Sequence, residues 1–301
     1  LSALHYCMFY YFSGMSLVPL EKDARAYCKQ MREYKQETSL YPCLAYHQCV
    51  LNLMGLSDNT YLLTGEAMDQ DELRMKVVEA KNIQAVTVVM LLRMQLAYYF
   101  GETDLFKTLL RESQSLREAF KGAHWGLVQT YFEGLVSLSI AREKTKAASR
   151  RPYLKVGRMS LKKLKAVVKC EGCNCLHMYL LLKAERMSLI DSADVKGIRE
   201  AYNAAINAAG RVGFMQDKAL SNELAGKFFL TKEDESWASH YLSKAYESYL
   251  EWGAKAKADQ LQRDHLGLIR INKRNHRRGS VGIKSRRIFS TEAADSHKRF
   301  S

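Results

Sequence analysis

The chain contains three prolines among its 301 residues, about a fifth of the usual frequency, and seventeen glycines with few clustered turn residues. A β-sandwich or a β-propeller needs a turn about every 8–12 residues, so the scarcity of turn residues argues against both folds. Because 47% of the residues are hydrophobic and 10% are aromatic, the chain can bury a sizeable core. We therefore expect an all-α protein.

Apolar residues recur at helical spacing along most of the chain, and this pattern predicts twelve helices. Pro42 and Pro152 fall where the first turn of a helix tolerates proline. The short connections between the expected helices favour antiparallel neighbours. The expected helices cover 3–12, 20–36, 42–55, 68–81, 83–100, 103–120, 124–143, 152–169, 174–190, 194–209, 215–230 and 234–262.

The segment 176–253 carries one-sided apolar stripes at helical spacing, which are expected to face neighbouring helices. They include Leu176, Leu180, Ala184, Met187 and Ile190, and then Ala201, Ala205, Ala208 and Val212. The stripes also repeat, because small and large residues recur 37 or 41 residues further on. A small residue on one helix, followed by a helix with alanines seven residues apart, is typical of tetratricopeptide (TPR) hairpins, whose usual period is about 34 residues. The alternative is an irregular helical bundle whose stripes repeat by chance. The residues expected to pack the repeats are Ala184, Ala201, Ala208, Ala225, Phe228, Ala238, Leu242, Ala245, Tyr249 and Trp252.

These patterns suggest three parts. Degenerate N-terminal hairpins are expected over 1–150, where no clean period is found, and TPR-like hairpins over 151–262. A disordered basic tail or linker is expected over 263–301, which has little apolar content and no periodicity. The fold predicted is a TPR-like helical hairpin solenoid that carries this tail.

Positive charge is concentrated in two segments of the chain, whose total formal charge is +14. Arg142–Lys169 holds eleven basic residues and Glu143, which gives +10, and 263–301 holds eleven basic and three acidic residues, which gives +8. Clustered lysine and arginine can bind nucleic acid or anionic lipid. A helix with an apolar stripe and a solvated basic face, sometimes with an acidic protein partner, explains 142–169 as well, and we favour it because few aromatic residues interleave with the charges.

The tail contains a candidate phosphoacceptor, Ser280, which follows Arg277 and Arg278 in the basic-basic-x-Ser form that basophilic kinases accept. The cluster Cys170-x-x-Cys173-x-Cys175-x-His177 offers four zinc ligands, but they crowd into eight residues. Structural zinc sites usually close the tetrahedron with a second, distant pair of ligands, so we expect an interhelical turn without metal.

We expect no membrane-spanning helix, since the best candidate, 1–20, is interrupted by polar residues and is followed by three charged ones. The seven cysteines are odd in number and mostly lie in helical patterns, which favours a reducing, cytoplasmic compartment. The chain begins at Leu1 and lacks the basic start of a signal peptide, so we expect a fragment of a longer protein.

No phosphate-binding loop Gly-x-x-x-x-Gly-Lys-Ser/Thr and no Gly-x-Gly-x-x-Gly is present in the sequence. The kinase motifs His-Arg-Asp and Asp-Phe-Gly, the hydrolase motif Gly-x-Ser-x-Gly and the metalloprotease motif His-Glu-x-x-His are absent too. The sequence therefore predicts no catalytic residue, no metal site and no cofactor within this chain.

The segment 220–261 resembles part of a family of large signalling proteins. The matching residues are Glu223-Leu224-Ala225, Phe228-Phe229, Ala238, Tyr241-Leu242, Ala245-Tyr246, Tyr249 and Trp252-Gly253-Ala254 with Lys257. Upstream, the segment 173–185 resembles the family's Asn-x-x-His-x-Tyr-x-Leu-Leu-x-Ala-Glu motif, and scattered motifs extend the resemblance over 9–262.

Proteins of this family join a serine/threonine-kinase-like domain and a STAND/AAA-type ATPase domain to a helical repeat region, which GAF and histidine-kinase modules follow. The resemblance implies that this chain is a non-catalytic scaffold for contacts with adjacent domains or a signalling partner protein. It implies ATP only for a parent protein. The alternative function is a basic helical protein that binds RNA or an anionic membrane, and a third class, an enzyme with an unrecognised site, has no supporting motif.

Overall fold

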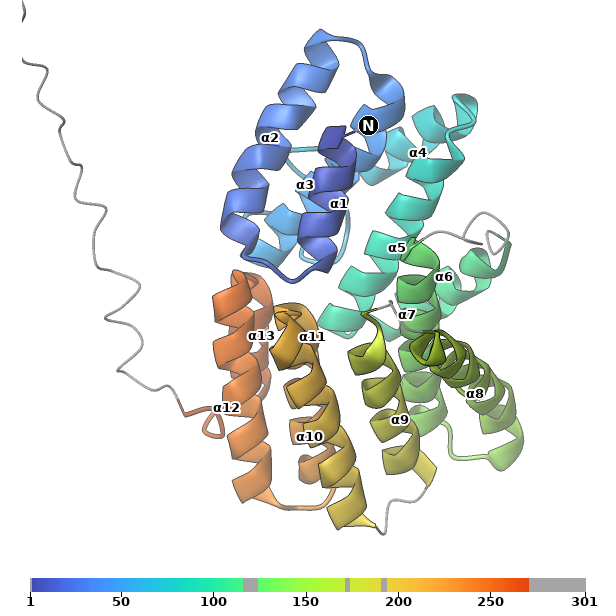
Figure 1. Ribbon diagram of the computed structural model, residues 1–301, viewed down its shortest axis with the longest axis vertical. Coiled ribbons are helices and arrows are strands. Elements are labelled where there is room, and N and C mark those ends of the chain that lie inside the picture. Colours follow the sequence, from blue (N-terminus) through green and yellow to red (C-terminus); the bar gives the residue numbers. More distant parts are fainter. Residues whose placement is uncertain (1, 116–123, 171–173, 191–193, 271–301) are drawn as a thin grey trace, which may run out of the picture. The chain divides into compact units, whose positions relative to one another are not determined.

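The computed structural model describes residues 2–115, 124–170, 174–190 and 194–270, and Leu1–Ile269 form one compact unit. Thirteen α-helices and no β-strand lie in these described residues, so the prediction of an all-α protein is confirmed (Figure 1). The helices are α1 Ser2–Phe12, α2 Leu17–Glu33, α3 Glu37–Met54, α4 Gln70–Glu79, α5 Ile83–Phe100, α6 Thr103–Ser115, α7 His124–Glu143, α8 Ala147–Lys169, α9 Leu176–Ile190, α10 Val195–Val212, α11 Met215–Leu230, α12 Glu235–Trp252 and α13 Lys255–Asp264.

The apolar pattern predicts one helix over 234–262, but the structure divides this segment into α12 and α13 at Gly253. Gly253 has a φ of 96°, a left-handed conformation that strains any residue with a side chain. A Cβ atom at this position would also lie 3.3 Å from the Leu17 Cβ atom. The prediction of a single helix is therefore wrong, because the turn redirects α13 toward α3 and α5, which it contacts.

Consecutive helices pair as hairpins, and the most extensive contacts join α2 with α3, α7 with α8, α9 with α10, and α11 with α12. The second helix of each of the last three hairpins contacts the helix that follows it. The first helices also touch, since α7 contacts α9 and α9 contacts α11. The C-terminal half of the compact unit is thus an ordered stack of hairpins.

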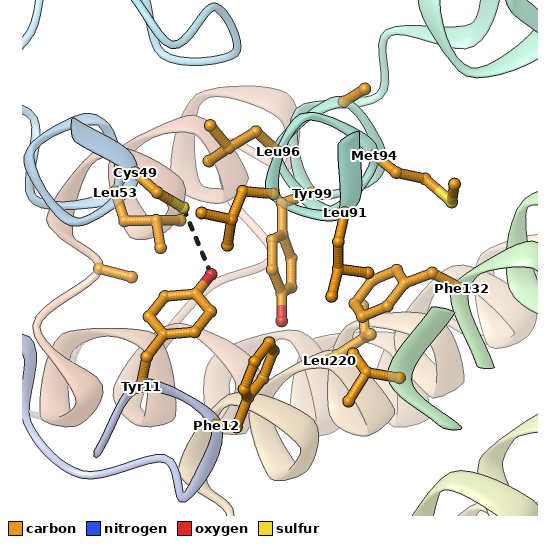
Figure 2. Packing of buried hydrophobic residues seen from close by; sticks show 14 of the residues in the cluster. Tyr11, Phe12, Cys49, Leu53, Leu91, Met94, Leu96, Tyr99, Phe132 and Leu220 are labelled. Atoms are coloured by element: carbon orange, nitrogen blue, oxygen red, sulfur yellow. Dashed lines mark hydrogen bonds between the residues drawn. The ribbon is translucent and has the colours of Figure 1, made fainter. Parts of the chain in front are cut away.

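The N-terminal helices α1 and α5 pack against the first helices of that stack. Figure 2 shows Phe12 of α1 and Tyr99 of α5 beside Phe132 of α7 and Leu220 of α11, while Tyr11 of α1 points toward Cys49 of α3. All of these side chains are buried, and the ring centroids of Tyr99 and Phe132 lie 6.1 Å apart. One continuous core therefore joins the two ends of the compact unit.

Helix α5 has the length and composition of a membrane span, the one such helix among the described residues, with a mean hydropathy of 1.3 over Ile83–Phe100. In the structure 72% of this window is buried by the surrounding helices. The burial accounts for the apolar composition, because a helix that is covered on every side has no polar face.

Two prolines lie deeper in their helices than the sequence indicates. Helix α3 begins at Glu37 and α8 begins at Ala147, so Pro42 and Pro152 fall in the second turn and not in the first, and that prediction is wrong. Proline lacks the N–H that would bond the carbonyl four residues earlier in a helix. In α3 the carbonyl left open in this way is that of Thr38.

The side chain of Asn82 supplies the missing donor. Its Nδ2 atom donates to the Thr38 carbonyl oxygen at 3.0 Å. Its Oδ1 atom accepts the Ala85 backbone N–H at 3.0 Å and so caps the start of α5. One asparagine therefore compensates for the proline in α3 and caps the start of the apolar helix α5.

We expect Asn82→Asp to lower the free energy of unfolding by about 1 kcal/mol, because aspartate keeps the cap but loses the donor to Thr38. Asn82→Ala, which loses both bonds, is expected to cost about 2 kcal/mol. Urea denaturation of the full chain measures both changes. In a Pro42→Ala background the backbone N–H at position 42 serves the Thr38 carbonyl, so Asn82→Asp should then cost less than about 0.5 kcal/mol; an equal cost in both backgrounds would contradict this account.

The C-terminal end of α5 is capped from α13. Two of its last four carbonyls accept N–H groups from the residues that follow the helix. The other two, those of Tyr99 and Phe100, accept from the Lys257 ammonium and from the Gln260 Nε2 atom (3.0 Å). A positive charge at a helix C-terminus also interacts favourably with the helix dipole. Residues about 160 positions further along the chain thus satisfy the last two carbonyls of α5.

Lys257 also forms a buried ion pair with Glu223 of α11. The Lys257 Nζ atom lies 2.9 Å from Glu223 Oε1, and both side chains are 2% exposed. The Tyr249 hydroxyl donates to Glu223 Oε2 at 2.7 Å, and the Lys227 ammonium donates to Oε1 at 2.6 Å. Burial raises the pKa of Glu223, but the charges of Lys227 and Lys257 and these hydrogen bonds outweigh it and lower the pKa to about 2. The carboxylate is therefore charged at neutral pH.

We expect Glu223→Gln to lower the free energy of unfolding at pH 7 by about 3 kcal/mol, because it leaves the Lys257 charge buried without its partner. The folded-state pKa of Glu223 lies below its usual value of about 4.3. The charged carboxylate therefore contributes its full share to the free energy of unfolding above about pH 5, and this share is lost as the pH falls toward 2. Guanidinium denaturation at pH 7 and pH 3 should therefore show a smaller cost of Glu223→Gln at pH 3.

The control for this measurement is Glu247→Gln, since Glu247 pairs with Lys244 on the surface at 2.9 Å. A surface pair of this kind contributes less than about 1 kcal/mol, so the control should change stability little at either pH. A cost of Glu223→Gln that matched the control would show that the buried pair does not hold α13 in place.

Candidate functional site

A groove opens between the C-terminal half of α8, the start of α9 and the last turns of α10. Its volume is about 530 Å³. Six of its lining residues are apolar and four are polar or charged, a composition typical of binding sites. The lining residues are Val168, Asn174, Leu176, His177, Leu180, Ala204, Asn207, Ala208, Arg211 and Val212.

Two apolar side chains of the groove are left in contact with solvent. Leu176 is 46% exposed and Val212 is 50% exposed, although the stripe pattern predicts both on the packing faces of α9 and α10. Large apolar side chains that lie together at the rim of a groove favour contact with a partner, because covering them removes apolar surface from water. Arg211, next to Val212 in the last turn of α10, adds positive charge at the same rim.

The inner side of the groove is closed by His177, which is 2% exposed. Its Nε2 atom lies 3.2 Å from the Asp217 carboxylate, and its ring stacks on Phe214 with the centroids 4.4 Å apart. The imidazole therefore connects α9 with Phe214, which precedes α11, and with Asp217 in the first turn of α11. Among the described residues, no group of three His, Cys, Asp or Glu side chains is placed to hold a metal ion.

The cysteines of the expected interhelical turn differ in exposure: Cys170 is exposed and Cys175 is buried. Cys173 lies outside the described residues. His177 lies beside Asp217, and the described members of this cluster do not converge on one point. The absence of zinc from the purified protein stays a prediction.

A basic surface on α8 lies beside the groove, whose lining residue Val168 belongs to that helix. The helix presents its apolar stripe inward, where Leu164 is fully buried and Gly157 faces Leu138 of α7. On the other side, the basic residues are exposed, and within the described part of the chain none of them forms an ion pair. The residues of this basic surface are Arg151, Lys155, Arg158, Lys162, Lys163, Lys165 and Lys169.

Arg142, at the start of the basic segment, is an exception because it turns toward the interior. Its guanidinium lies 3.2 Å from the Glu185 carboxylate and donates to the Ser188 hydroxyl at 2.7 Å. The negative charge of Glu185 raises the pKa of Arg142 against the opposing effect of burial. The Tyr202 hydroxyl donates to the second Glu185 oxygen, so this cluster joins α7, α9 and α10.

Eight of the ten expected packing residues are buried, while Ala201 and Ala208 are half-buried. The buried face of α10 is formed by Ile198, Tyr202, Ala205 and Ala209, so it is rotated by one residue from the expected stripe. Ala208 lines the groove as a result. The eight buried residues are Ala184, Ala225, Phe228, Ala238, Leu242, Ala245, Tyr249 and Trp252.

The candidate phosphoacceptor Ser280, with Arg277 and Arg278, lies outside the described residues. Sequence reasoning also missed the buried charges of Glu185, Glu223 and Lys257, because a charged residue is read as a solvent-facing position. The signal that could have found Glu223 is the absence of a polar stripe on α11, where apolar and polar residues alike are buried over most of the helix.

The chain was compared with known proteins: no family model, no curated protein and no solved structure matches it. The resemblance to kinase- and ATPase-linked signalling proteins therefore stays a prediction.

Proposed function

We propose that this chain is a non-catalytic, TPR-like scaffold that binds an acidic protein segment with apolar side chains in the groove between α8, α9 and α10. The order of contacts supports the TPR-like arrangement: each hairpin of α7–α8, α9–α10 and α11–α12 packs on the next, and their first helices touch. Stacks of this kind build extended binding surfaces from a repeated unit.

The side of the hairpin stack that can bind a partner depends on which side the N-terminal helices cover. In a hairpin stack, the side shared by the first helices is a common binding surface, but here α1 and α5 occupy it. Tyr11 and Gln95 meet Tyr131, Met178 and Asp217 there, around a cavity of only about 20 Å³. Among the described residues of the stack, the groove lined by α10 and the ends of α8 and α9 is a concave feature that stays accessible. This open groove, beside the basic surface of α8, is the observation that carries the proposal.

The side chains in and beside the groove indicate the chemistry of its partner. Leu176, Leu180 and Val212 offer apolar contact, and Asn174 and Asn207 can hydrogen-bond a peptide backbone. The basic surface of α8 and Arg211 would attract a negatively charged segment and speed its encounter with the groove. In a multidomain signalling protein such a segment can belong to an adjacent domain or to a partner protein. ATP, if a parent protein uses it, would be bound elsewhere.

A second candidate function is binding of RNA or an anionic membrane, which the exposed lysines and arginines of α8 favour. Such binding depends on phosphate contacts, so it weakens steeply with salt and needs no apolar groove. Binding of poly(U) or phosphatidylserine vesicles, measured against salt concentration, tests it. Charge reversal anywhere along α8 should weaken this binding about equally.

We expect random 12-residue peptides selected on the full chain by phage display to be enriched in Asp and Glu together with Leu, Ile or Phe. Synthetic versions should bind at least about tenfold more weakly to a Val212→Asp variant, since this change adds a negative charge and removes apolar contact. Fluorescence anisotropy measures the dissociation constants.

The matched control is Val18→Asp, because Val18 is a 45% exposed valine on α2, away from the groove. Lys165→Glu with Lys169→Glu should weaken peptide binding more than Arg151→Glu with Lys155→Glu, since Lys165 and Lys169 flank the groove residue Val168. Peptides without acidic enrichment, or equal binding to the two valine variants, would contradict the proposal. Equal loss from both pairs on α8, with tight and salt-sensitive binding of poly(U) or vesicles, would favour the second candidate.

A further inference from the structure

Another pocket of the described residues lies where α4 and α6 both pack on α5. Its volume is about 200 Å³. Five of its lining residues are apolar, two are arginines and one is a glutamate, and none of them lines the groove beside α8. These residues of the α5 pocket are Val77, Val78, Val86, Val89, Met90, Arg74, Arg93 and Glu112.

The apolar wall of the α5 pocket runs from the core to the surface. Val77, Val89 and Met90 are buried, whereas Val78 is 61% exposed. Val86 lies between these extremes, since it is half-buried. A hydrocarbon chain in the pocket would remove apolar surface from water, which is favourable. The wall therefore suits a ligand with an apolar part.

The polar part of the α5 pocket includes Arg93, from the middle of α5. The Nε atom of Arg93 is buried and has no hydrogen-bond partner among the described residues. Burial lowers the pKa of Arg93 against the attraction of Glu112, but a guanidinium stays charged at neutral pH. A buried N–H group without an acceptor is unfavourable, so an anionic acceptor placed here would gain a charge-assisted hydrogen bond.

The charges around the α5 pocket favour a ligand with a single negative charge. Arg74 of α4 brings a second guanidinium, and Glu112 of α6 brings one carboxylate, so the lining carries a net charge of +1. A guanidinium presents its donors in a planar fork that matches the two oxygens of a carboxylate. A phosphate group carries close to two negative charges and has no apolar part, so it fits the valine wall less well.

We propose that the α5 pocket binds a small monocarboxylate with a hydrocarbon chain, whose carboxylate pairs with Arg93 and Arg74 while the chain lies on the valine wall. The volume sets the size of the ligand. A protein cavity of about 150 Å³ holds a molecule as large as benzene, so 200 Å³ suits a chain of about four to six carbons. A peptide segment needs a larger site.

The test is a titration of hexanoate into the full chain at pH 7, with isotope labels on its valine and methionine methyl groups for NMR. We expect the signals of Val89 and Met90 to shift and that of Val212, in the groove beside α8, to stay in place. Each methylene removed from water raises affinity about fourfold, so hexanoate should bind at least about tenfold more tightly than acetate. It should exceed hexanol, which lacks the charge, by a similar factor.

Three variants separate the contributions. Arg93→Met keeps the apolar stem and removes the guanidinium, so it should weaken hexanoate binding at least about tenfold and leave hexanol binding unchanged. Its matched control is Arg111→Met, because Arg111 is an exposed arginine of α6 that does not line the pocket. Glu112→Gln should strengthen hexanoate binding, since it removes a like charge. Circular dichroism checks that each variant folds, and the comparison of hexanoate with hexanol needs no variant.

Equal binding of hexanoate and hexanol, methyl shifts at Val212 in place of Val89 and Met90, or an equal loss in the two arginine variants would overturn the proposal. Tighter binding of acetyl-alanyl-leucine, which carries the same carboxylate on a peptide, would overturn it in favour of a chain terminus. The α5 pocket and the groove share no lining residue, so these outcomes are independent of peptide binding in the groove.

Discussion

The ammonium group of Lys257 connects the two ends of this fold. It donates to the Tyr99 carbonyl in the last turn of α5 and pairs with Glu223 of α11, and both side chains are only 2% exposed. The apolar helix α5 has its C-terminus inside the protein, and its Tyr99 and Phe100 carbonyls would lose these donors if α13 were absent. Burying a lysine is costly unless its charge is paired and its N–H groups are bonded, and Glu223, Tyr99 and Gln260 fulfil both conditions. Lys257 therefore helps to hold α13 against α5 and α11.

A second buried carboxylate repeats the arrangement one hairpin earlier. Glu185 on α9 accepts from Tyr202 on α10 and pairs with Arg142 on α7, as Glu223 on α11 accepts from Tyr249 on α12 and pairs with Lys257 on α13. Each carboxylate thus bonds a tyrosine from its own hairpin and a cation from a neighbouring helix. Since a buried charge tolerates few alternative positions, such a cluster fixes how one hairpin sits on the next more narrowly than apolar contact does. The two clusters therefore share the same three parts: a buried carboxylate, a tyrosine and a cation.

The sequence predicted the helical class and most helices, because apolar spacing and helix ends are local properties. It failed where distant residues decide the outcome. The stripe on α9 was expected to include Leu176 and Ile190, but both are exposed, and the buried face instead holds His177, Glu185 and Ser188. An apolar pattern cannot reveal a polar residue that is buried because its partner comes from another helix. The same limit explains why the groove beside α8 was not foreseen although its basic surface was.

The groove is connected to the core through His177. One side of this residue lines the groove, while its imidazole lies against Asp217 and Phe214, next to α11. Asp217 borders the small cavity where α1, α5 and α7 meet, and the adjacent Gln216 donates to the last carbonyl of α1 at 2.8 Å. In an open solenoid each hairpin contacts only its neighbours, so a ligand on one hairpin affects distant ones weakly. Here the contacts of α11 with α1 and of α13 with α5 close the stack onto the N-terminal helices. His177 therefore links the groove to the core that α1, α5, α7 and α11 share.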